Sequence, residues 1–240
     1  AGLEPPLPTA EPWPKSRLLK EERESVGFYV TGHPLEAYTA ENRAFASAQI
    51  TDAAAIIERE GPVDDSWAGR QNRPQHTFCG IITSVQHRMT KGGKPWASAH
   101  FEDFSGQAEL VCFSNTYDRV QNYLNVDEII LIKGPVEMRG GMAKVMANDV
   151  IPMWKVREQL VKSLSIRIQA AELNLSHVDE LETLLSEHRG TCKLYFDLVD
   201  EERPQPTRIL CRSFVVDPNT EVMQGIEKIF GRRSIVVEGD

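Results

Sequence analysis

The fold of this chain is decided by residues 76–113, HTFCGIITSVQHRMTKGGKPWASAHFEDFSGQAELVCF. Apolar and polar residues alternate through this stretch in three runs that are separated by turn-forming residues. A period of two predicts three β-strands, over residues 77–85, 95–102 and 107–113. Further along, the pattern predicts a helix and then two strands joined by a Gly140-Gly141 turn, over residues 115–124, 128–136 and 142–150.

Three strands, a helix and two more strands follow one another in the order of the OB fold, which is a five-stranded β-barrel. We therefore expect one such domain over residues 76–151. OB folds bind oligonucleotides on their second and third strands and through the loops after strands one and four. The order of the predicted elements thus makes single-stranded nucleic acid the expected ligand.

A basic loop and aromatic residues occupy the positions where such a ligand would bind. The loop, residues 87–94, places cations around two glycines, and glycine lets a phosphate approach the backbone while the cations neutralise it. Aromatic rings on or beside the following strand can stack on bases. Trp96 and Phe104 suit either the surface or the core, whereas Phe101 is predicted to be core. The candidate contacts are His87, Arg88, Lys91, Lys94, Trp96 and Phe104.

Strands four and five and the turn between them carry three further cations. They could extend the basic track of the loop, although single lysines on strands are more often solvated. These candidates are Lys133, Arg139 and Lys144.

The residues before the barrel divide into two segments. Residues 1–14 contain five prolines and are predicted to be a linker, and residues 15–75 are predicted to be helical or irregular. One helix is expected to begin at Lys15 and a second to cover residues 35–45, with Thr31 or Gly32 near the cap of the second.

Residues 160–240 alternate strand and helix patterns in the order β-α-β-β-α-β, which is typical of a split βαβ domain. Ser176 is the candidate N-cap of its first helix, and Gly231 is the candidate C-cap of its second. Residues 152–160 are interpreted as a connector. The whole chain is thus predicted to be mixed α+β, with a helical N-terminal segment, an OB barrel and a small α+β domain.

Charge and composition narrow the classes of function. The net charge is −8 and the hydrophobic content is 41%, which is ordinary for a globular protein and unsuited to coating duplex DNA by bulk charge. No apolar run is long enough to span a bilayer and no secretion signal is recognisable, so we expect a cytoplasmic protein without membrane contact. The four cysteines form no C-x-x-C pair and are expected to be buried, reduced thiols.

No constellation of catalytic or metal-binding side chains is recognisable in the sequence. The histidines show no metal-ligand spacing with one another or with the cysteines. Glu102 and Asp103 are adjacent carboxylates, but they precede Ser105-Gly106, where aspartate commonly caps a turn. We therefore expect no catalytic residue, no metal and no cofactor in this chain.

The last 81 residues, 160–240, are a poor DNA binder and a reasonable surface for docking a protein, since they carry 10 basic and 14 acidic side chains. Helical periodicity predicts that most apolar residues of the last helix are core. The candidate docking residues are Val222, Ile226, Ile229, Phe230, Arg232 and Arg233.

Three blocks of sequence resemble the C-terminal region of the bacterial DNA polymerase III alpha subunit family. They are KEERESVGFYVTGHPL (20–35), ITSV with RMTKGGK after it (82–85 and 88–94), and FEDFSG (101–106) followed by Glu109 and Val111. Their order and spacing match the family through residues 13–151. The residues from 160 onward resemble the C-terminal domain of the family more weakly, by position and pattern.

The resemblance implies an OB domain associated with single-stranded template DNA and a C-terminal domain that docks the tau subunit of the clamp loader. It also implies that the metal-binding carboxylates of the polymerase lie upstream of the residue that matches Ala1. The family's peptide for the sliding clamp would likewise lie upstream. The parent activity would be DNA-directed DNA polymerisation, a nucleotidyl transfer, without catalytic residues in this chain.

Other interpretations remain open from the sequence. The tRNA-binding OB module of class II aminoacyl-tRNA synthetases shares the barrel, although the helices at 15–45 and the β-α-β-β-α-β pattern argue against it. The chain could also be a pure protein-interaction scaffold. An enzyme in its own right is disfavoured because the sequence shows no metal or nucleophile cluster.

Overall fold

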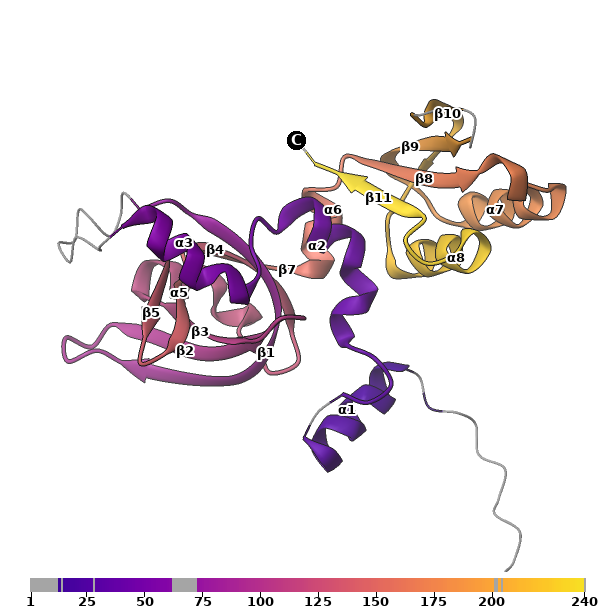
Figure 1. The fold of residues 1–240 in the computed structure, drawn as a ribbon. Coiled ribbons are helices and arrows are strands. Elements are labelled where there is room, and N and C mark those ends of the chain that lie inside the picture. Colours follow the sequence, from indigo (N-terminus) through magenta and orange to yellow (C-terminus); the bar gives the residue numbers. More distant parts are fainter. Residues whose placement is uncertain are drawn as a thin grey trace, which may run out of the picture.

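The computed structural model describes residues 13, 15–27, 29–61, 73–200, 203 and 205–239. They form a barrel and a second, smaller sheet with two helices, and the short helix α2 lies between the two (Figure 1). The chain is therefore mixed α+β, with an OB-fold sheet and a second small sheet, as predicted. The linker predicted over residues 1–14 lies almost entirely outside the described residues, as does most of the loop before the barrel.

The barrel is built from one sheet in which β1 pairs with two neighbours. The first half of β1 lies antiparallel to β4 and its second half antiparallel to β2, with a bulge between Ile82 and Ser84. The strand order is β5-β6-β3-β2-β1-β4-β7, and β3 runs parallel to β6. Because β4 leads directly into β5 through Pro135, the sheet closes on itself. The strands are β1 His76–Met89, β2 Pro95–Glu102, β3 Gln107–Cys112, β4 Ile129–Gly134, β5 Val136–Arg139, β6 Met142–Met146 and β7 Asp149–Pro152.

The strand predicted over residues 128–136 is broken in two at Pro135. Proline has no N–H to give to a neighbouring strand, so β4 ends at Gly134 and β5 begins at Val136. A Cβ atom on Gly134 would overlap the carbonyl group of Met146. Only glycine permits so close an approach of two backbones, and this approach is what brings the ends of the sheet together.

The strand predicted over residues 142–150 also divides, because it changes partners. Its first half, β6, pairs with β3 and β5. Ala147 N then donates to Val111 O (2.9 Å) and Asn148 N donates to Lys133 O (2.8 Å), after which β7 pairs with β4. The buried positions change parity at the switch, from Ala143, Val145 and Ala147 to Val150, so the switch leaves a mark in the sequence pattern.

The interior of the barrel is filled by alternate residues of the strands. Phe78, Ile82, Phe101 and Ile130 are fully buried there, and each such side chain stabilises the fold by about 1.5–3 kcal/mol relative to exposure. The core position of Phe101 is thus confirmed. The helix predicted over residues 115–124 is α5 (Ser114–Val120) followed by the 3-10 helix η3 (Gln121–Tyr123).

The described residues before the barrel form short helices, and the second predicted helix starts as a 3-10 turn. Its cap is His33, whose Nδ1 accepts a hydrogen bond from Leu35 N (3.1 Å) and which directly follows the predicted Thr31 and Gly32. Burial lowers the pKa of His33, which keeps this nitrogen available as an acceptor. The helices are α1 Lys15–Val26, η1 Pro34–Tyr38, α2 Thr39–Phe45, η2 Ile50–Asp52 and α3 Ala53–Glu60.

Residues 152–160, interpreted from the sequence as a connector, contain the helix α6 (Met153–Gln159). Met153 and Val156 of this helix are fully buried against Leu35 of η1 and Leu131 of β4. A second apolar cluster therefore lies outside the barrel and attaches the N-terminal helices to it.

Arg157 of α6 joins three parts of the chain. Its guanidinium forms an ion pair with Glu41 of α2 and donates to Ala37 O (2.7 Å) and to Thr220 Oγ1 (2.9 Å). It also lies 4.4 Å from the centroid of the Tyr38 ring. The side chains of Arg157 and Glu41 are only 5% and 0% exposed, so the two domains and the N-terminal helices share a buried polar contact.

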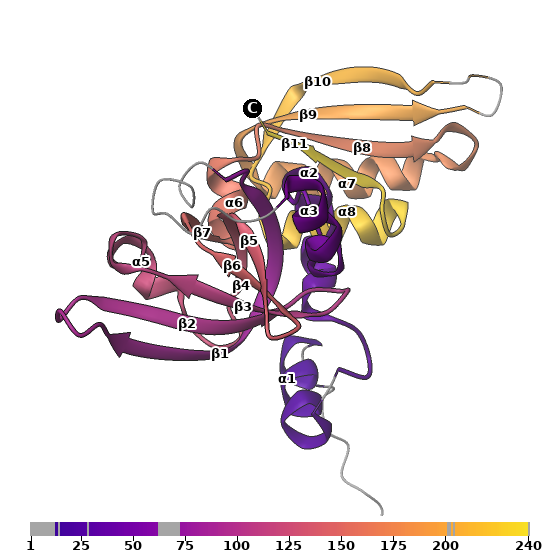
Figure 2. The ribbon, with the colours of Figure 1, turned by 60° about the vertical axis from the view of Figure 1, so that its left-hand side comes forward.

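The tail domain, residues 163–239, has a four-stranded sheet with α7 and α8 on one face (Figures 1 and 2). The strand order is β10-β9-β8-β11, in which β8 and β9 are parallel and the other neighbours antiparallel. The N-cap of α7 is Asn174, whose side chain accepts from His177 N (3.0 Å), and not the predicted Ser176. Gly231 (φ 88°) ends α8, as predicted. The elements are β8 Ser163–Gln169, η4 Ala170–Glu172, α7 Leu175–Glu187, β9 Arg189–Val199, β10 Thr207–Val216, α8 Thr220–Phe230 and β11 Ile235–Glu238.

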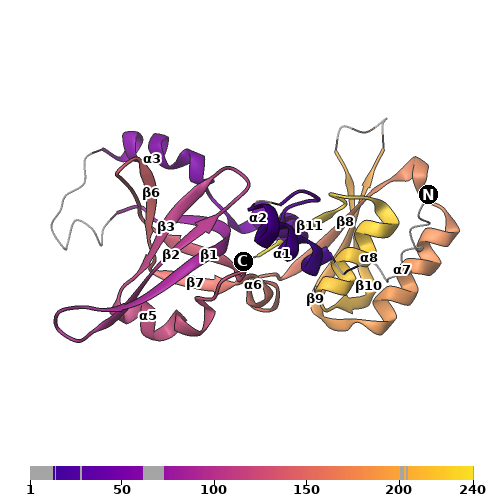
Figure 3. The same cartoon turned by 90° about the horizontal axis from the view of Figure 1, so that it is seen from below.

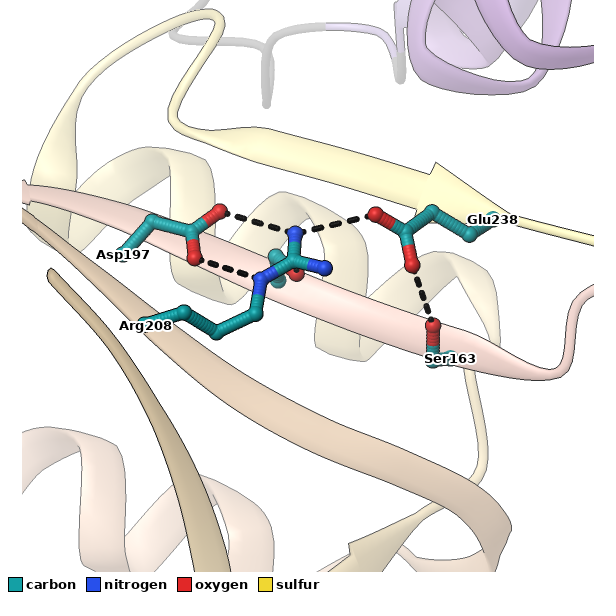
Figure 4. Close-up of polar contacts among 5 residues, drawn as sticks. Ser163, Asp197, Arg208 and Glu238 are labelled. Carbon is teal, nitrogen blue, oxygen red and sulfur yellow. Dashed lines mark hydrogen bonds and ion pairs between the residues drawn. The ribbon is translucent and has the colours of Figure 1, made fainter. Parts of the chain in front are cut away.

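A polar network crosses the face of the tail sheet that the helices leave uncovered (Figure 4). Arg208 of β10 donates to both oxygens of Asp197 on β9 (2.9 and 3.2 Å), to Ser165 on β8 (3.0 Å) and to Glu238 on β11 (2.9 Å). Glu238 also accepts from Ser163 (3.1 Å). Hydrogen bonds to Asp197 and Glu238 raise the pKa of Arg208, so one permanent cation ties the four strands together.

Candidate nucleic-acid interface

The outer surface of β1, β2 and β3 carries one arginine beside two aromatic rings. Arg88 on β1 faces Trp96 on β2 in the strand register, and its guanidinium carbon lies 5.5 Å from the centroid of the Trp96 ring. The Trp96 ring is stacked on Phe113, with centroids 6.0 Å apart and planes at 29°, and Phe113 is 50% exposed. This Arg88–Trp96–Phe113 cluster has the chemistry that holds a base by stacking and a phosphate by charge.

Strand alternation and the bulge of β1 place the cluster on one face. Ala97 faces the core, so the preceding Trp96 faces outward. Before the bulge, even-numbered residues such as Ile82 face the core of the barrel, whereas Val85 packs on the core after it. The extra residue of the bulge thus reverses the parity of the strand and brings Arg88 to the same side as Trp96.

The loop predicted over residues 87–94 is reduced to a tight turn, and its first residues belong to β1. Thr90 N donates to Lys94 O (2.8 Å), and Gly93, at φ 75°, donates through its N–H to Thr90 O (3.0 Å). Lys91 and Lys94 are exposed in this turn. The turn ends a β1–β2 hairpin that projects from the body of the barrel (Figures 2 and 3), so the two lysines lie at its tip.

Two predicted contacts lie away from the cluster. His87 Nδ1 is 3.0 Å from the hydroxyl of Tyr117 in α5, and the two rings meet edge to face. His87 therefore occupies the opposite face of β1 from Arg88. Phe104, in the turn between β2 and β3, is half exposed and packs on the His33 ring with centroids 5.0 Å apart. It belongs to the contact between the barrel and the N-terminal helices.

The adjacent carboxylates at residues 102–103 are explained by turn structure. Asp103 Oδ1 accepts from Ser105 N (2.7 Å) and Gly106 N (2.9 Å), which confirms the predicted cap. Its Oδ2 accepts from Ile50 N (2.8 Å) and so fixes η2 to the barrel.

The other predicted cations do not join the cluster. Lys144 on β6 forms an ion pair with Glu109 of β3 (3.4 Å) and is largely covered. Its ammonium is therefore engaged by a carboxylate of the neighbouring strand. Lys133 on β4 and Arg139 in the β5–β6 hairpin are exposed. Positive charge on the face of β1–β3 is concentrated at its Arg88 end.

Sequence reasoning did not select Phe113 or Gln86. Gln86 accepts a hydrogen bond from Arg88 through Oε1, which helps to orient the guanidinium. Phe113 follows β3, and a two-residue period puts it on the same face as Glu109 and Val111. That parity is the signal by which the sequence could have identified it.

The residues predicted to dock a partner differ in exposure, and Ile229 and Phe230 are half buried against the tail core. Val222 and Ile226 are fully buried because the apolar face of α8 packs on the tail sheet, so they cannot meet a partner, which corrects the prediction. Arg232 and Arg233 lie exposed in the turn after α8. Arg232 lies 3.9 Å from Glu36 of η1.

Among the described residues, no group of three or more His, Cys, Asp and Glu side chains is placed to hold a metal ion. Burial raises the pKa of Cys79 and Cys112 to about 12 and that of Cys192 to about 11, so these thiols are poor nucleophiles. In the part of the chain that the structure describes, no helix is long and apolar enough to cross a membrane.

Two family models match the chain. The model described as DNA polymerase III alpha subunit, C-terminal domain, matches residues 164–229, and the model described as OB-fold nucleic acid binding domain matches residues 76–153. The DNA polymerase III alpha subunit of Mycobacterium tuberculosis (strain H37Rv) is 28% identical over 220 residues, which are 91% of this chain and 17% of that protein. The alpha subunit of Saccharopolyspora erythraea is 30% identical over 196 residues, which are 79% of this chain and 15% of that protein. The chain belongs to the DNA polymerase III alpha subunit family.

Within the alpha subunit family, this chain is the OB and tail region. The matched segments cover the barrel strands β1 to β7 and most of the tail domain, from β8 into α8, and the relatives named are about six times longer than the aligned part. The resemblance read from the sequence is confirmed, including its weaker part in the tail. Because alpha subunits align over both domains, they account for the chain better than a tRNA-synthetase module does. Among solved structures, the chain is similar to the SSB domain of a Synechococcus sp. protein (TM-score 0.31, 10% identity, 33% of this chain and 94% of that chain covered).

Proposed function

We propose that this region of the alpha subunit binds single-stranded DNA on the outer face of β1–β3, centred on the Arg88–Trp96–Phe113 cluster. The observation that carries the proposal is the stack of Trp96 on Phe113 with a guanidinium alongside. The region acts by binding, without chemistry or a cofactor of its own. Nucleotidyl transfer belongs to other parts of the subunit.

The energetics favour a single strand over a duplex. An aromatic face contributes about 1–3 kcal/mol per stacked base, and the bases of a duplex are already stacked on one another. The barrel carries 7 basic and 8 acidic side chains over residues 76–151, so bulk charge attracts neither form strongly. Lys91 and Lys94 add local charge at the tip of the hairpin, where they can follow a strand that leaves the cluster.

Fluorescence anisotropy of a labelled oligothymidylate of roughly 15 nucleotides, near the upper site size of one OB fold, tests this proposal. Trp96→Ala is expected to weaken binding about 5- to 150-fold, the equivalent of 1–3 kcal/mol. Arg88→Ala is expected to weaken binding and to reduce the salt slope by about 0.7. Lys133→Ala, an exposed cation on β4, is the matched control. Parent-like binding by both cluster variants would refute the assignment.

We further propose that the tail domain docks the tau subunit of the clamp loader, and that residues outside this chain contact the sliding clamp. Two features support docking. The domain is acidic, and it exposes the apolar residues Leu173, Leu175 and Val178; exposed apolar surface often marks a protein interface. Surface plasmon resonance against immobilised tau measures it, and Trp96→Ala is expected to leave tau binding unchanged. Absence of tau binding by the parent chain would overturn the docking role. Tau binding without DNA binding would make the chain a pure interaction scaffold.

A further inference from the structure

The tail domain contains a cavity of about 380 Å³ where the end of β8 meets the turn between α8 and β11. Arg167 of β8 donates through its backbone N–H to Ser234 O (2.7 Å), which holds the strand against this turn. His177 of α7 and Phe230 of α8 also line the cavity and meet edge to face with centroids 5.7 Å apart. The walls therefore come from both helices and from the sheet.

Positive charge collects at this cavity on a domain that is otherwise acidic. Arg167, Arg232 and Arg233 all line it, and Glu172 is the only acid among the described lining residues. Neither Arg167 nor Arg233 forms an ion pair within the described part of the chain, and Arg232 reaches Glu36 only at 3.9 Å. Residues 160–240 as a whole carry 10 basic and 14 acidic side chains. The three guanidinium groups thus provide a local site for an anion that the rest of the domain does not neutralise.

Arg233 is also held in a strained backbone conformation. Its φ is 71°, a value that among the described non-glycine residues only Asp127 shares. The left-handed region costs an L-residue about 1–2 kcal/mol, and such strain is concentrated at binding and switch sites. A glycine would suit this turn better for folding, so the arginine at this position points to a role for its side chain.

An apolar shelf adjoins the cavity in sequence. Leu173, Leu175 and Val178 are 41%, 82% and 44% exposed, and they alternate along the chain with the cavity-lining Glu172 and His177. Leu175 and Val178 are three residues apart on α7 and share one face of the helix. Exposed aliphatic side chains therefore lie next in sequence to Glu172 and His177, which line the cavity.

We propose that this arginine cavity and the apolar shelf beside it in sequence bind a short segment of a partner protein. In that segment carboxylates alternate with aliphatic residues. The proposal rests on the docking role of the tail and names the chemistry of its site. Carboxylates pair with the planar guanidinium groups of Arg167 and Arg233, and aliphatic side chains cover Leu175 and Val178. Single-stranded DNA fits less well, because the two rings of the cavity, His177 and Phe230, pack edge to face on each other and the acidic domain repels a polyanion.

Anisotropy of a labelled peptide of alternating leucine and glutamate, added to the whole chain, tests the chemistry. Its twin with glutamine for glutamate, inorganic phosphate and oligothymidylate serve as competitors. The acidic peptide is expected to bind about tenfold or more tightly than its neutral twin. Equal affinity of the two peptides would overturn the proposal. So would displacement by phosphate or oligothymidylate at equal concentration, because it would indicate a simple anion site or a nucleic-acid site.

Three variants assign the contact. Arg233→Gly removes the guanidinium and suits the positive φ, so loss of binding cannot be attributed to misfolding. Arg233→Gly and Arg167→Ala are each expected to weaken the acidic peptide about tenfold or more. Leu175→Ser is expected to weaken both peptides alike. Arg212→Ala, an exposed arginine of β10 outside the cavity, is the matched control and is expected to bind like the parent. Parent-like binding by Arg233→Gly and Arg167→Ala would overturn the assignment.

Binding to tau separates this inference from the docking role on which it rests. If the parent chain and Arg233→Gly bind tau equally, the tail docks tau and the cavity is not its site. If the parent chain does not bind tau but binds the acidic peptide through Arg167 and Arg233, the docking role fails while the peptide site stands for another partner.

Discussion

Replacing Arg157 by methionine is expected to destabilise the whole chain more than any surface substitution does. The guanidinium forms an ion pair with Glu41, donates to Ala37 O and Thr220 Oγ1, and stacks on Tyr38. Methionine keeps much of the apolar volume of arginine but none of these polar contacts. Glu41, which is 0% exposed, would then be a buried charge without a counter-charge.

The magnitude follows from that burial. Breaking a buried ion pair by removing one partner costs about 3–5 kcal/mol, chiefly because the other charge is left without compensation. For a chain of this size, each kcal/mol lowers the melting temperature by about 2–4 °C, so Arg157→Met is expected to melt about 6–20 °C below the parent. Arg119→Met is the matched control, since Arg119 is 61% exposed and lies 3.8 Å from Asp149. An exposed pair contributes at most about 1 kcal/mol.

Circular dichroism melting curves test whether the unpaired charge of Glu41 causes this loss of stability. Four chains are compared: the parent, Arg157→Met, Arg119→Met and the double variant Glu41→Leu/Arg157→Met. The double variant removes both charges, so it is expected to melt above Arg157→Met although it carries one more substitution. A double variant that melts at or below Arg157→Met would refute the argument, because the cost would then come from lost packing and not from the stranded carboxylate of Glu41.

Three further predictions concern the closure of the barrel, the cap of η1 and the cysteines. Gly134→Ala is expected to lose at least about 1–3 kcal/mol of unfolding free energy in urea, because its Cβ would overlap the Met146 carbonyl; parent-like stability would show that the barrel closes differently. Burial lowers the pKa of His33 below its ordinary 6.5, so the stability that this residue confers is present above that value and is lost as the pH falls through the lower folded pKa. His33→Asn retains a capping side chain and should melt with a weaker pH dependence between about pH 7 and 5, and an unchanged dependence would exclude His33 as its source. Of the four thiols, only Cys211 should react readily with a thiol reagent at about pH 8 in the native chain. The reason is that burial raises the pKa of Cys79, Cys112 and Cys192. Rapid labelling of any of these three in the native chain would contradict the prediction.

Strong local patterns made much of the fold predictable from the sequence. β2 (Pro95–Glu102) has the predicted bounds, because it has a clear period and ends at turn residues. The caps themselves were less predictable. His33 and Asn174 accept hydrogen bonds at positions where the sequence offers several suitable side chains nearby, and the choice among them depends on how the preceding chain approaches.

The features that the sequence did not reveal depend on contacts between distant segments. The helix α6 is too short for its periodicity to stand out, and its burial comes from η1 and β4. The predicted fifth strand divides because it changes partner from β3 to β4, which are segments far apart in the sequence. In the site, Trp96 and Arg88 were both selected, but their pairing depends on a bulge that reverses the parity of β1, and that bulge has no signal in the sequence.

The short helix α2 explains why the two binding sites proposed for this chain are expected to act together. Two domains with separate cores usually turn against each other about the segment that joins them. Here Phe45 of α2 packs on the tail core and on the cluster outside the barrel, and a Cβ atom on Gly239 would overlap its ring. Arg157 of α6 adds a buried polar contact with Glu41 of α2 and with Thr220 of the tail domain. A partner held by the tail is thereby held at a set distance from the Arg88–Trp96–Phe113 cluster, so docking at one site raises the effective concentration of a linked ligand at the other.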